Sequence, residues 1–228
     1  SIFVADYFSS RYLGAIIVAA YSYMALVPII QPPVIRLITT KEERRIHMDY
    51  QGGSVSRTAR ILFPVCITIV AGLIAPRSVA LVGFLMFGNL IRECGVLDSL
   101  SETAQGTLAN LITLLLGITV ASQMRAENFL NVQTIFILLL GLVAFVFDTV
   151  GGVLFAKLLN LFRKNKINPM IGACGISAFP MSARVITQMG LQEDPTNVLI
   201  MQATGVNVSG QIASVIAGGL LLGLIPLM

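Results

Sequence analysis

The sequence predicts an all-α, polytopic membrane protein whose membrane helices include broken, re-entrant segments. Of its 228 residues, 56% are hydrophobic and only 11% are charged, whereas soluble domains carry about 25% charged residues. Several apolar runs also reach the roughly 20 residues that a helix needs to cross a bilayer. A third observation is the run from Asn168 to Arg184, which is apolar but interrupted by proline, glycine and polar residues. Together these observations favour a membrane domain over an unusually apolar soluble one.

Apolar runs separated by loops define the expected membrane segments in chain order. Proline removes a backbone donor and clashes with the preceding turn, so we expect segments to break or end at prolines. The third segment is short for a full crossing, which makes a re-entrant helix its alternative. The expected segments are Tyr12–Ile38, broken at Pro28 and at Pro32-Pro33; Ile61–Ala75; Ser78–Ile91; Leu108–Ser122, after a polar link Asp98–Gln105; Val132–Phe162, with Gly151-Gly152 in its middle; and Asn197–Met228, interrupted at Gly205–Gly210.

Basic residues gather in two loops, Arg36–Arg60 and Arg163–Lys166. Cytoplasmic loops of membrane proteins are enriched in lysine and arginine, so both loops are expected on the cytoplasmic side. Four crossings between them satisfy this placement, and the count changes by one or two if the short third segment is re-entrant. The net charge of +4 is modest and no basic face is interleaved with aromatic residues, so nucleic-acid binding is not expected.

The chain offers few candidate residues for a transition-metal site, a disulfide bond or a catalytic triad. Its cysteines, Cys66, Cys94 and Cys174, are odd in number and lack C-x-x-C spacing, which disfavours a disulfide framework or a zinc site. His47 is the single histidine, so a histidine cluster cannot form and a catalytic role for His47 is not expected. The chain shows no signal peptide and does not begin with methionine; we expect a fragment or a processed product.

A break in the helical backbone is predicted between residues 168 and 184. Pro169 and Pro180 interrupt helical hydrogen bonding, and two glycines between them loosen the chain. Broken backbone at membrane depth is tolerated only where protein or a watery cavity covers it, and transporters place ion and substrate sites there. This stretch therefore indicates a function as well as a class.

Polar side chains accompany the predicted break. Asn168 and Gly172 are four residues apart, and Ser177 and Arg184 are seven apart, so each pair would share a helical face. The break would expose free carbonyls beside an amide and a hydroxyl, and a hard monovalent cation binds several such oxygens. The guanidinium of Arg184 suits a carboxylate. The alternative is a kinked helix that packs through small residues, but an intramembrane arginine favours a site.

A second polar cluster occupies Ala203–Gln211. Asn207 shares a helical face with Gly210 and with Gln211, because residues three and four apart are neighbours on a helix. This cluster could supply a second set of cation ligands that faces the first. A packing interface of small residues is the alternative.

Two further candidates lie inside apolar segments. Tyr21 and Tyr23 are two residues apart and face different ways on a helix, so at most one points into a site. Tyr23, a turn and a half before Pro28, is the better candidate for an interior donor, and Tyr21 for an interfacial anchor. Asp148 lies where an acid costs about 3 kcal/mol or more. It should face an ion or proton path, or be satisfied by a backbone neighbour.

These residues give the sequence a resemblance to a known family. It resembles the β subunit of the sodium-pumping, biotin-dependent decarboxylases, the oxaloacetate, methylmalonyl-CoA, glutaconyl-CoA and malonate enzymes. The resemblance covers nearly the whole chain at compatible order and spacing, and chance similarity of apolar segments would not reproduce its polar positions. The matching runs are AAYSYMALVPIIQPP, TTKEERRI, FGNLIRECGV, INPMIGACGISAFPMSARV and GVNVSGQIAS.

The resemblance implies an activity and a set of site residues. A subunit of this family receives carboxybiotin from a carrier domain, decarboxylates it in the membrane with consumption of a proton, and exports sodium. The implied catalytic residues are Arg184 and Tyr23, and the implied contacts with carboxybiotin are Arg184 and Ser177. The implied sodium ligands are Asn168, Gly172, Ser177 and Asn207.

The resemblance also implies a larger assembly. The expected partners are a biotin carrier protein, a carboxyltransferase subunit and a small single-span subunit of γ/δ type, in a homo-oligomer surrounded by lipid in the bacterial inner membrane. One departure concerns the family's essential aspartate, which lies in a D-G-P motif expected just before Ser1 and absent here. We therefore expect residues 1–228 to form one membrane domain, the C-terminal part of a larger subunit, inactive alone. The missing broken helix would be the inverted-repeat partner of the stretch 168–184.

Two other functions compete with this interpretation. A sodium-coupled secondary transporter of a carboxylate could use the same architecture and would take up a free organic acid. A non-catalytic membrane scaffold would tolerate replacement of the polar residues at the helix breaks. The pump instead requires sodium-dependent decarboxylation of carboxybiotin.

Overall fold

The structure is a computed structural model that describes residues 2–10, 12–48, 55–123, 132–176 and 178–224. Every regular element in these residues is helical, which confirms the all-α class. Among them, five helices are long and apolar enough to cross a membrane, as expected of a polytopic protein. These are α2 (Leu13–Ile38), α4 (Arg57–Ile74), the helical run Asp98–Ser122, α9 (Val132–Phe162) and α11 (Ile200–Leu224).

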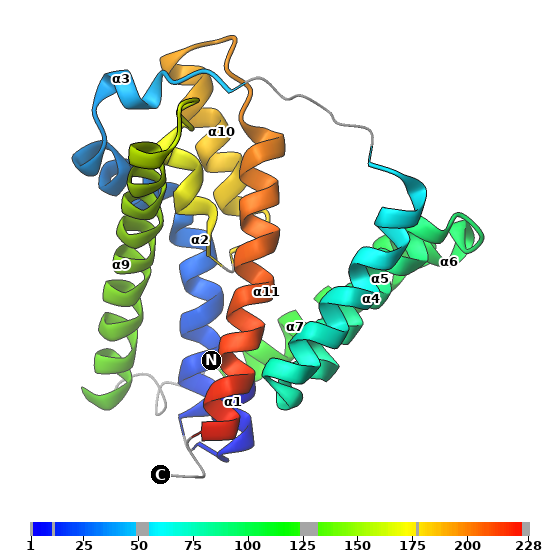
Figure 1. Ribbon diagram of the computed structural model, residues 1–228. Helices are drawn as coiled ribbons and strands as arrows, with labels where there is room; N and C mark the ends of the chain where they lie inside the picture. Colours follow the sequence, from blue (N-terminus) through cyan, green and yellow to red (C-terminus); the bar gives the residue numbers. More distant parts are fainter. Residues whose placement is uncertain (1, 11, 49–54, 124–131, 177, 225–228) are drawn as a thin grey trace. The chain divides into compact units, whose positions relative to one another are not determined.

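The chain divides into two compact units, and the helices of each can be followed in Figure 1. Unit 1 comprises Ser1–Val18, Gly52–Thr134 and Val215–Met228, and unit 2 comprises Ala19–Gln51 and Ile135–Ser214. Both candidate site clusters, 168–184 and 203–211, belong to unit 2.

Unit 1 contains a helical hairpin of α4 and α5 (Val79–Cys94), joined by the short η1 (Pro76–Ser78). At the open end of this hairpin, Nη2 of Arg57 donates to the Cys94 carbonyl at 2.7 Å. Arg60 and Glu93 form an ion pair at 3.2 Å beside it. The predicted third segment is confirmed as short, because α5 has 16 residues. The other helices of unit 1 are α1 (Ile2–Tyr7), α6 (Asp98–Thr103), the π-helical turn η2 (Ala104–Leu108) and α7 (Ala109–Gln123).

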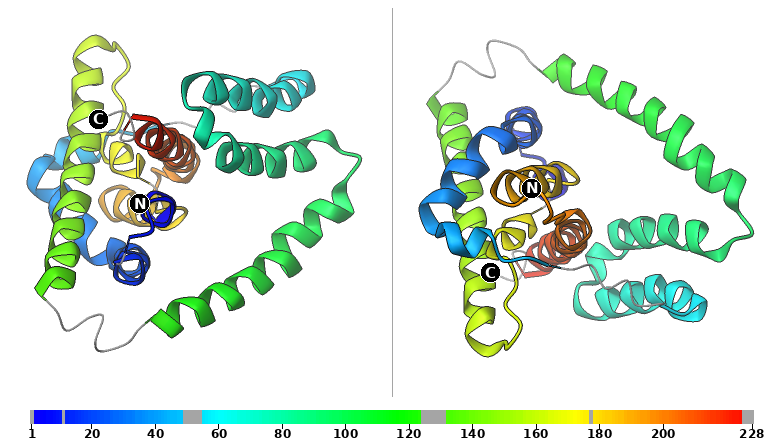
Figure 2. Two further views of the ribbon diagram at one scale, coloured as in Figure 1. Left: turned by 90° about the horizontal axis from the view of Figure 1, so that it is seen from below. Right: turned by 90° about the horizontal axis from the view of Figure 1, so that it is seen from above.

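In unit 2, α2, α9 and α11 stand around a central pair of short elements, η3 (Pro169–Cys174) and α10 (Met181–Glu193) (Figures 1 and 2). The short α3 (Lys41–Arg44) follows α2 at one end of this unit. The buried core is built where these elements meet. It includes Val27, Ile35, Val153, Met170, Ile186 and Leu199.

The predicted break of the first segment is wrong. Pro28, Pro32 and Pro33 all lie inside the continuous helix α2. Proline's fixed φ is compatible with a helix, and neighbouring elements in a membrane protein tolerate the missing donors. Here Val27, Gln31 and Ile35, spaced four apart, are fully buried, so packing along one face holds the helix through its prolines.

Two other predicted irregularities are also wrong. The helix α11 runs without interruption across Gly205–Gly210. Its Gly210 is used for close approach, because a Cβ there would lie 2.5 Å from the carbonyl carbon of Gly175. The link expected at Asp98–Gln105 is helical and continues through η2 into α7. By contrast, the segment Val132–Phe162 is confirmed as one continuous helix that ends at Phe162.

Candidate functional site

The predicted break in the backbone is present. Asn168 caps η3, and its Oδ1 accepts from the Met170 amide at 3.1 Å. The 3₁₀ segment ends at Cys174, and regular helix resumes only at Met181. A 3₁₀ segment followed by irregular chain leaves carbonyl groups without the donors that an α-helix supplies. Those carbonyls need partners from elsewhere.

Side-chain amides from two other helices supply the missing donors. On α11, Nδ2 of Asn207 donates to the carbonyl of Cys174 at 3.0 Å and to that of Ile176 at 2.7 Å. On α2, Nε2 of Gln31 donates to the carbonyl of Ala173 at 2.9 Å. Both amide side chains are fully buried. The carbonyls of Ala173, Cys174 and Ile176 are therefore held by side chains of α2 and α11.

Among the described residues, no group donates a hydrogen bond to the carboxamide oxygen of Asn207, although Asn207 is fully buried. The two hydrogen bonds of Nδ2 fix the orientation of this amide, because reversal would set its oxygen against two carbonyl oxygens. A buried acceptor without a donor costs about 1–3 kcal/mol. A cation beside Oδ1 would remove this cost. The arrangement is thus a candidate cation site in which Oδ1 of Asn207 is one ligand.

Glycine residues allow the backbone of the broken segment to lie in close contact with α9 and α11. A Cβ on Gly210 of α11 would lie 2.6 Å from the carbonyl oxygen of Gly175, and one on Gly152 of α9 would overlap the carbonyl of Gly172. Asn207 and Gly210 therefore face the broken segment together, as their spacing predicted. The Gly172 carbonyl accepts from the Gly175 amide at 3.1 Å, so in this structure Gly172 serves close packing.

Asn168 lies at the other end of η3 from Asn207. Its Nδ2 donates to the carbonyls of Arg44 at 2.7 Å and Ile46 at 3.0 Å. Six residues separate Asn168 from Cys174, which is about 12 Å at the 3₁₀ rise of about 2.0 Å per residue. The structure therefore does not bring Asn168 to Asn207, and Asn168 ties the broken segment to the loop that follows α2.

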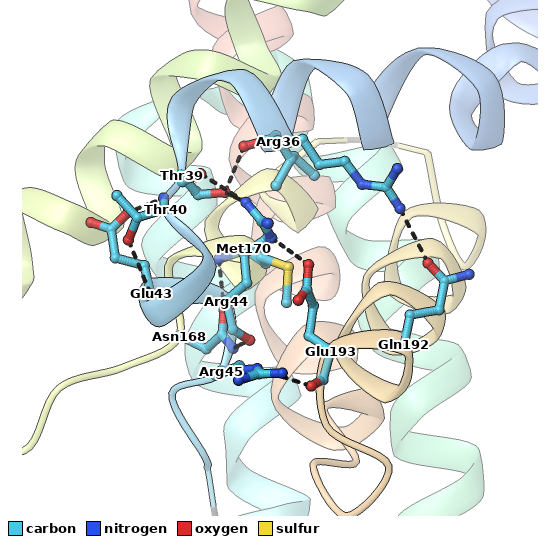
Figure 3. A network of polar contacts seen from close by, with 11 residues as sticks. Arg36, Thr39, Thr40, Glu43, Arg44, Arg45, Asn168, Met170, Gln192 and Glu193 are labelled. Atoms are coloured by element: carbon cyan, nitrogen blue, oxygen red, sulfur yellow. Dashed lines mark hydrogen bonds and ion pairs between the residues drawn. The ribbon is translucent and has the colours of Figure 1, made fainter.

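That loop, Thr39–Met48, is held by an ion-pair network at the end of unit 2 (Figure 3). Nε of Arg44 pairs with Glu193 at 2.7 Å, and its Nη1 donates to the Thr39 carbonyl at 2.8 Å. The hydrogen bond from Arg44 holds the pKa of the Glu193 carboxyl below its ordinary value. The loop is thereby tied to the end of α10.

Glu43 makes a second attachment of the same loop. It completes a capping box with Thr40 at the start of α3, and it pairs with Lys157 of α9 at 2.9 Å. Partial burial alone would raise the pKa of the Glu43 carboxyl. The hydrogen bonds from the Thr40 amide and from Lys157 outweigh that effect and hold the pKa below its ordinary value. The loop is therefore bound to α9 as well as to α10 and the broken segment.

The remaining predicted residues are placed separately. The Tyr23 hydroxyl donates to the Leu138 carbonyl, and its ring packs against Gly141. Tyr23 precedes Gln31 by eight residues on α2, about 12 Å along the helix.

Arg184 is exposed on α10, and among the described residues no ion pair engages its guanidinium. Ser177 lies outside the described residues, and Asp148 is exposed on α9.

Two buried residues of the site had been given no role from the sequence. Gln31 and Ser182 are fully buried, and Oγ of Ser182 lies 3.0 Å from Oε1 of Gln31. The available signal was Gln31 itself, a polar residue in register with Val27 and Ile35 on an otherwise apolar helix. Ser182 carried no comparable signal, because serine is common where membrane helices pack.

Comparison with known proteins gives a match over most of the chain. The family model described as "Na+-transporting oxaloacetate decarboxylase beta subunit" matches residues 1–225. The chain is 50% identical over 222 residues to oxaloacetate decarboxylase beta chain 2 of Salmonella typhi, covering 97% of this chain and 51% of that protein. It is 50% identical over 224 residues to methylmalonyl-CoA decarboxylase subunit beta of Propionigenium modestum, covering 98% and 56%.

A third relative is named for another substrate. Glutaconyl-CoA decarboxylase subunit beta of Acidaminococcus fermentans is 48% identical over 225 residues, covering 99% of this chain and 60% of that protein. The chain thus spans about half the length of the curated relatives it matches.

Proposed function

Because the chain belongs to the family of the Na+-transporting oxaloacetate decarboxylase beta subunit, we propose that it is part of a membrane subunit that decarboxylates carboxybiotin and couples this reaction to sodium export. Relatives at similar identity are named for oxaloacetate, methylmalonyl-CoA and glutaconyl-CoA. A subunit shared by enzymes with such different acyl substrates acts on a common intermediate, and carboxybiotin is that intermediate.

The observation that carries this proposal is that Oδ1 of Asn207, beside the broken backbone, has no hydrogen-bond donor in the part of the chain that the structure describes. Sodium is a hard cation that binds oxygen ligands, and the buried amide oxygen of Asn207 is one such ligand. We assign Asn207 as a sodium ligand, with Ser177 as a further ligand from the same break. Asn168 and Gly172 contribute by shaping the break, because their polar atoms are already engaged by the backbone.

Arg184 is the proposed contact of the carboxybiotin carboxylate. Its guanidinium can donate two parallel hydrogen bonds to a carboxylate, and in the described residues no carboxylate partner holds it. Tyr23 is assigned a positioning role, because its hydroxyl ties α2 to the Leu138 carbonyl of α9. Loss of CO2 from the carboxylate consumes a proton and removes a negative charge near Arg184. The proposed consequence is weaker sodium binding and release to the outside.

The coupling has a minimum energetic requirement. Moving one charge against the membrane potential costs about 2.3 kcal/mol per 100 mV. Decarboxylation must lower the free energy by at least this amount per exported ion. The amide and hydroxyl ligands carry no net charge. They therefore bind sodium weakly enough for the ion to be released again.

The assembly and location are proposals of the same kind. The biotin carrier protein and the carboxyltransferase subunit would deliver carboxybiotin, and a small γ/δ-type subunit would complete a homo-oligomeric complex in the bacterial inner membrane. Residues 1–228 would act as one membrane domain within the full-length subunit. The loop Thr39–Met48, rich in basic residues, would face the cytoplasm, where the carrier arrives.

The test is decarboxylation of carboxybiotin by the complete subunit, measured as a function of sodium concentration. The proposal predicts a sodium-dependent rate that falls in Arg184→Ala and Asn168→Ala, with Gln188→Ala, an exposed position on the same helix as Arg184, as a matched control. Rates and sodium dependence unchanged in the first two variants would refute the site assignment. Sodium-driven uptake of a free organic acid without decarboxylation would show a secondary transporter instead.

A further inference from the structure

Three polar groups of unit 2 lie within hydrogen-bond distance of one another and form a polar ring. Nε2 of Gln31 donates to the Ala173 carbonyl at 2.9 Å, and Oγ of Ser182 lies 3.0 Å from Oε1 of Gln31 and 3.2 Å from the Ala173 oxygen. The hydroxyl has one proton, so it donates to one of these two acceptors at a time. All three residues are fully buried. Every polar atom of the ring is therefore satisfied without water.

The ring lies next to the candidate cation site along the broken chain. The carbonyl that it holds, that of Ala173, immediately precedes the Cys174 carbonyl that Asn207 holds. Ser182 is in the first turn of α10, where helix resumes after the break. The ring thus fixes the chain on both sides of the Cys174–Ile176 turn. If it opened, the carbonyls that engage Nδ2 of Asn207 would no longer be held in place.

We propose that Gln31 and Ser182 are positioning residues of the cation site. By holding the Ala173 carbonyl from α2 and α10, they set the carbonyls of Cys174 and Ile176 where Asn207 can donate to both. The amide of Asn207 then has one orientation, with Oδ1 left for the cation. This inference rests on the proposed function, because it assumes that the cation bound there is sodium.

Cys174 provides a readout that does not depend on decarboxylation. Its side chain is fully buried, so a maleimide reaches it only when the broken segment opens. In the full-length subunit with the other cysteines replaced, we expect slow labelling of Cys174 that sodium slows further. Gln31→Ala and Ser182→Ala should label at least several-fold faster. They should also need about tenfold more sodium for protection, the change expected when one organising hydrogen bond is lost.

Matched variants separate positioning from general packing. Gln188→Ala, at an exposed position of α10, and Ser209→Ala, whose hydroxyl bonds only within α11, should label like the parent protein. In Gln31→Glu, a protonated carboxyl can still donate to the Ala173 carbonyl and an ionised one cannot. Lowering the pH should therefore restore protection in Gln31→Glu and leave Gln31→Ala unchanged.

The possible failures are distinguishable. If sodium does not change the rate of Cys174 labelling in the parent protein, the assignment of the cation site is wrong, and the positioning role of Gln31 and Ser182 is overturned as well. If sodium protects the parent protein but Gln31→Ala and Ser182→Ala label and respond like the controls, only the positioning role is overturned. Enzyme assays give a second readout: positioning predicts a raised sodium requirement with a turnover at saturating sodium within about twofold of the parent.

Discussion

Replacing Gly152 by alanine is expected to destabilise the contact between α9 and the broken segment. A Cβ on Gly152 would overlap the carbonyl oxygen of Gly172 and lie 2.9 Å from its carbonyl carbon. The obstructing atoms belong to backbone, so no side-chain rotation can relieve the overlap. Forcing an extra carbon into such a packed site costs about 1–3 kcal/mol.

The neighbouring glycine supplies the matched control. A Cβ on Gly151 would meet nothing within 4 Å, so Gly151→Ala brings only the better helix propensity of alanine, about 1 kcal/mol. Gly152→Ala gains the same propensity and suffers the overlap. The difference between the two variants therefore isolates the packing term, which is about 2 kcal/mol.

The assay is thermal unfolding of the full-length subunit in detergent, followed by circular dichroism. Gly151→Ala should unfold at or above the temperature of the parent protein, and Gly152→Ala should unfold clearly below Gly151→Ala. Equal unfolding temperatures for the two variants would show that η3 does not pack on α9 as described. The placement of the broken segment would then be wrong.

Two further predictions concern contacts outside this packing interface. Because the pKa of Glu193 is held below its ordinary value by Arg44, the ion pair stabilises the fold at neutral pH, and this contribution is lost as the pH falls through the depressed pKa. Glu193→Gln should therefore lower stability by about 1 kcal/mol at pH 7 but not at acid pH, and a pH-independent loss in unfolding experiments would contradict this reasoning. Tyr23→Phe removes the hydrogen bond to the Leu138 carbonyl and should cost about 1 kcal/mol, measured in the same way; unchanged stability would argue against an anchor.

The sequence predicted best those features of the fold that depend on residues close together in the chain. The helix over Val132–Phe162 was predicted because an apolar run of that length has one stable form in a bilayer. The break after Asn168 was predicted because proline and polar residues coincide there. The prolines of α2 led to a wrong prediction, because the helix is held by packing of its buried face, Val27 and Ile35, against elements that are distant in the sequence.

The candidate site was predictable only in part for the same reason. The shared face of Asn207 and Gly210 follows from helical spacing, and both do meet the broken segment. The hydrogen bonds of Asn168 to the loop after α2, however, join residues more than 120 positions apart. The ring of Gln31 and Ser182 is likewise non-local, so no spacing rule could have revealed it.

Direct sodium titration of the full-length subunit by calorimetry tests the central assignment, with two variants of Asn207 compared with the parent protein. Asn207→Leu removes the ligand oxygen and should weaken sodium binding at least about tenfold, or about 1.4 kcal/mol. Asn207→Asp keeps an oxygen in place of Oδ1, but it also sets an oxygen against the carbonyls of Cys174 and Ile176 in place of the Nδ2 donor, so it should bind sodium less tightly than the parent protein. Sodium bound by Asn207→Leu with the affinity of the parent protein would contradict the assignment of a cation site at this helix break.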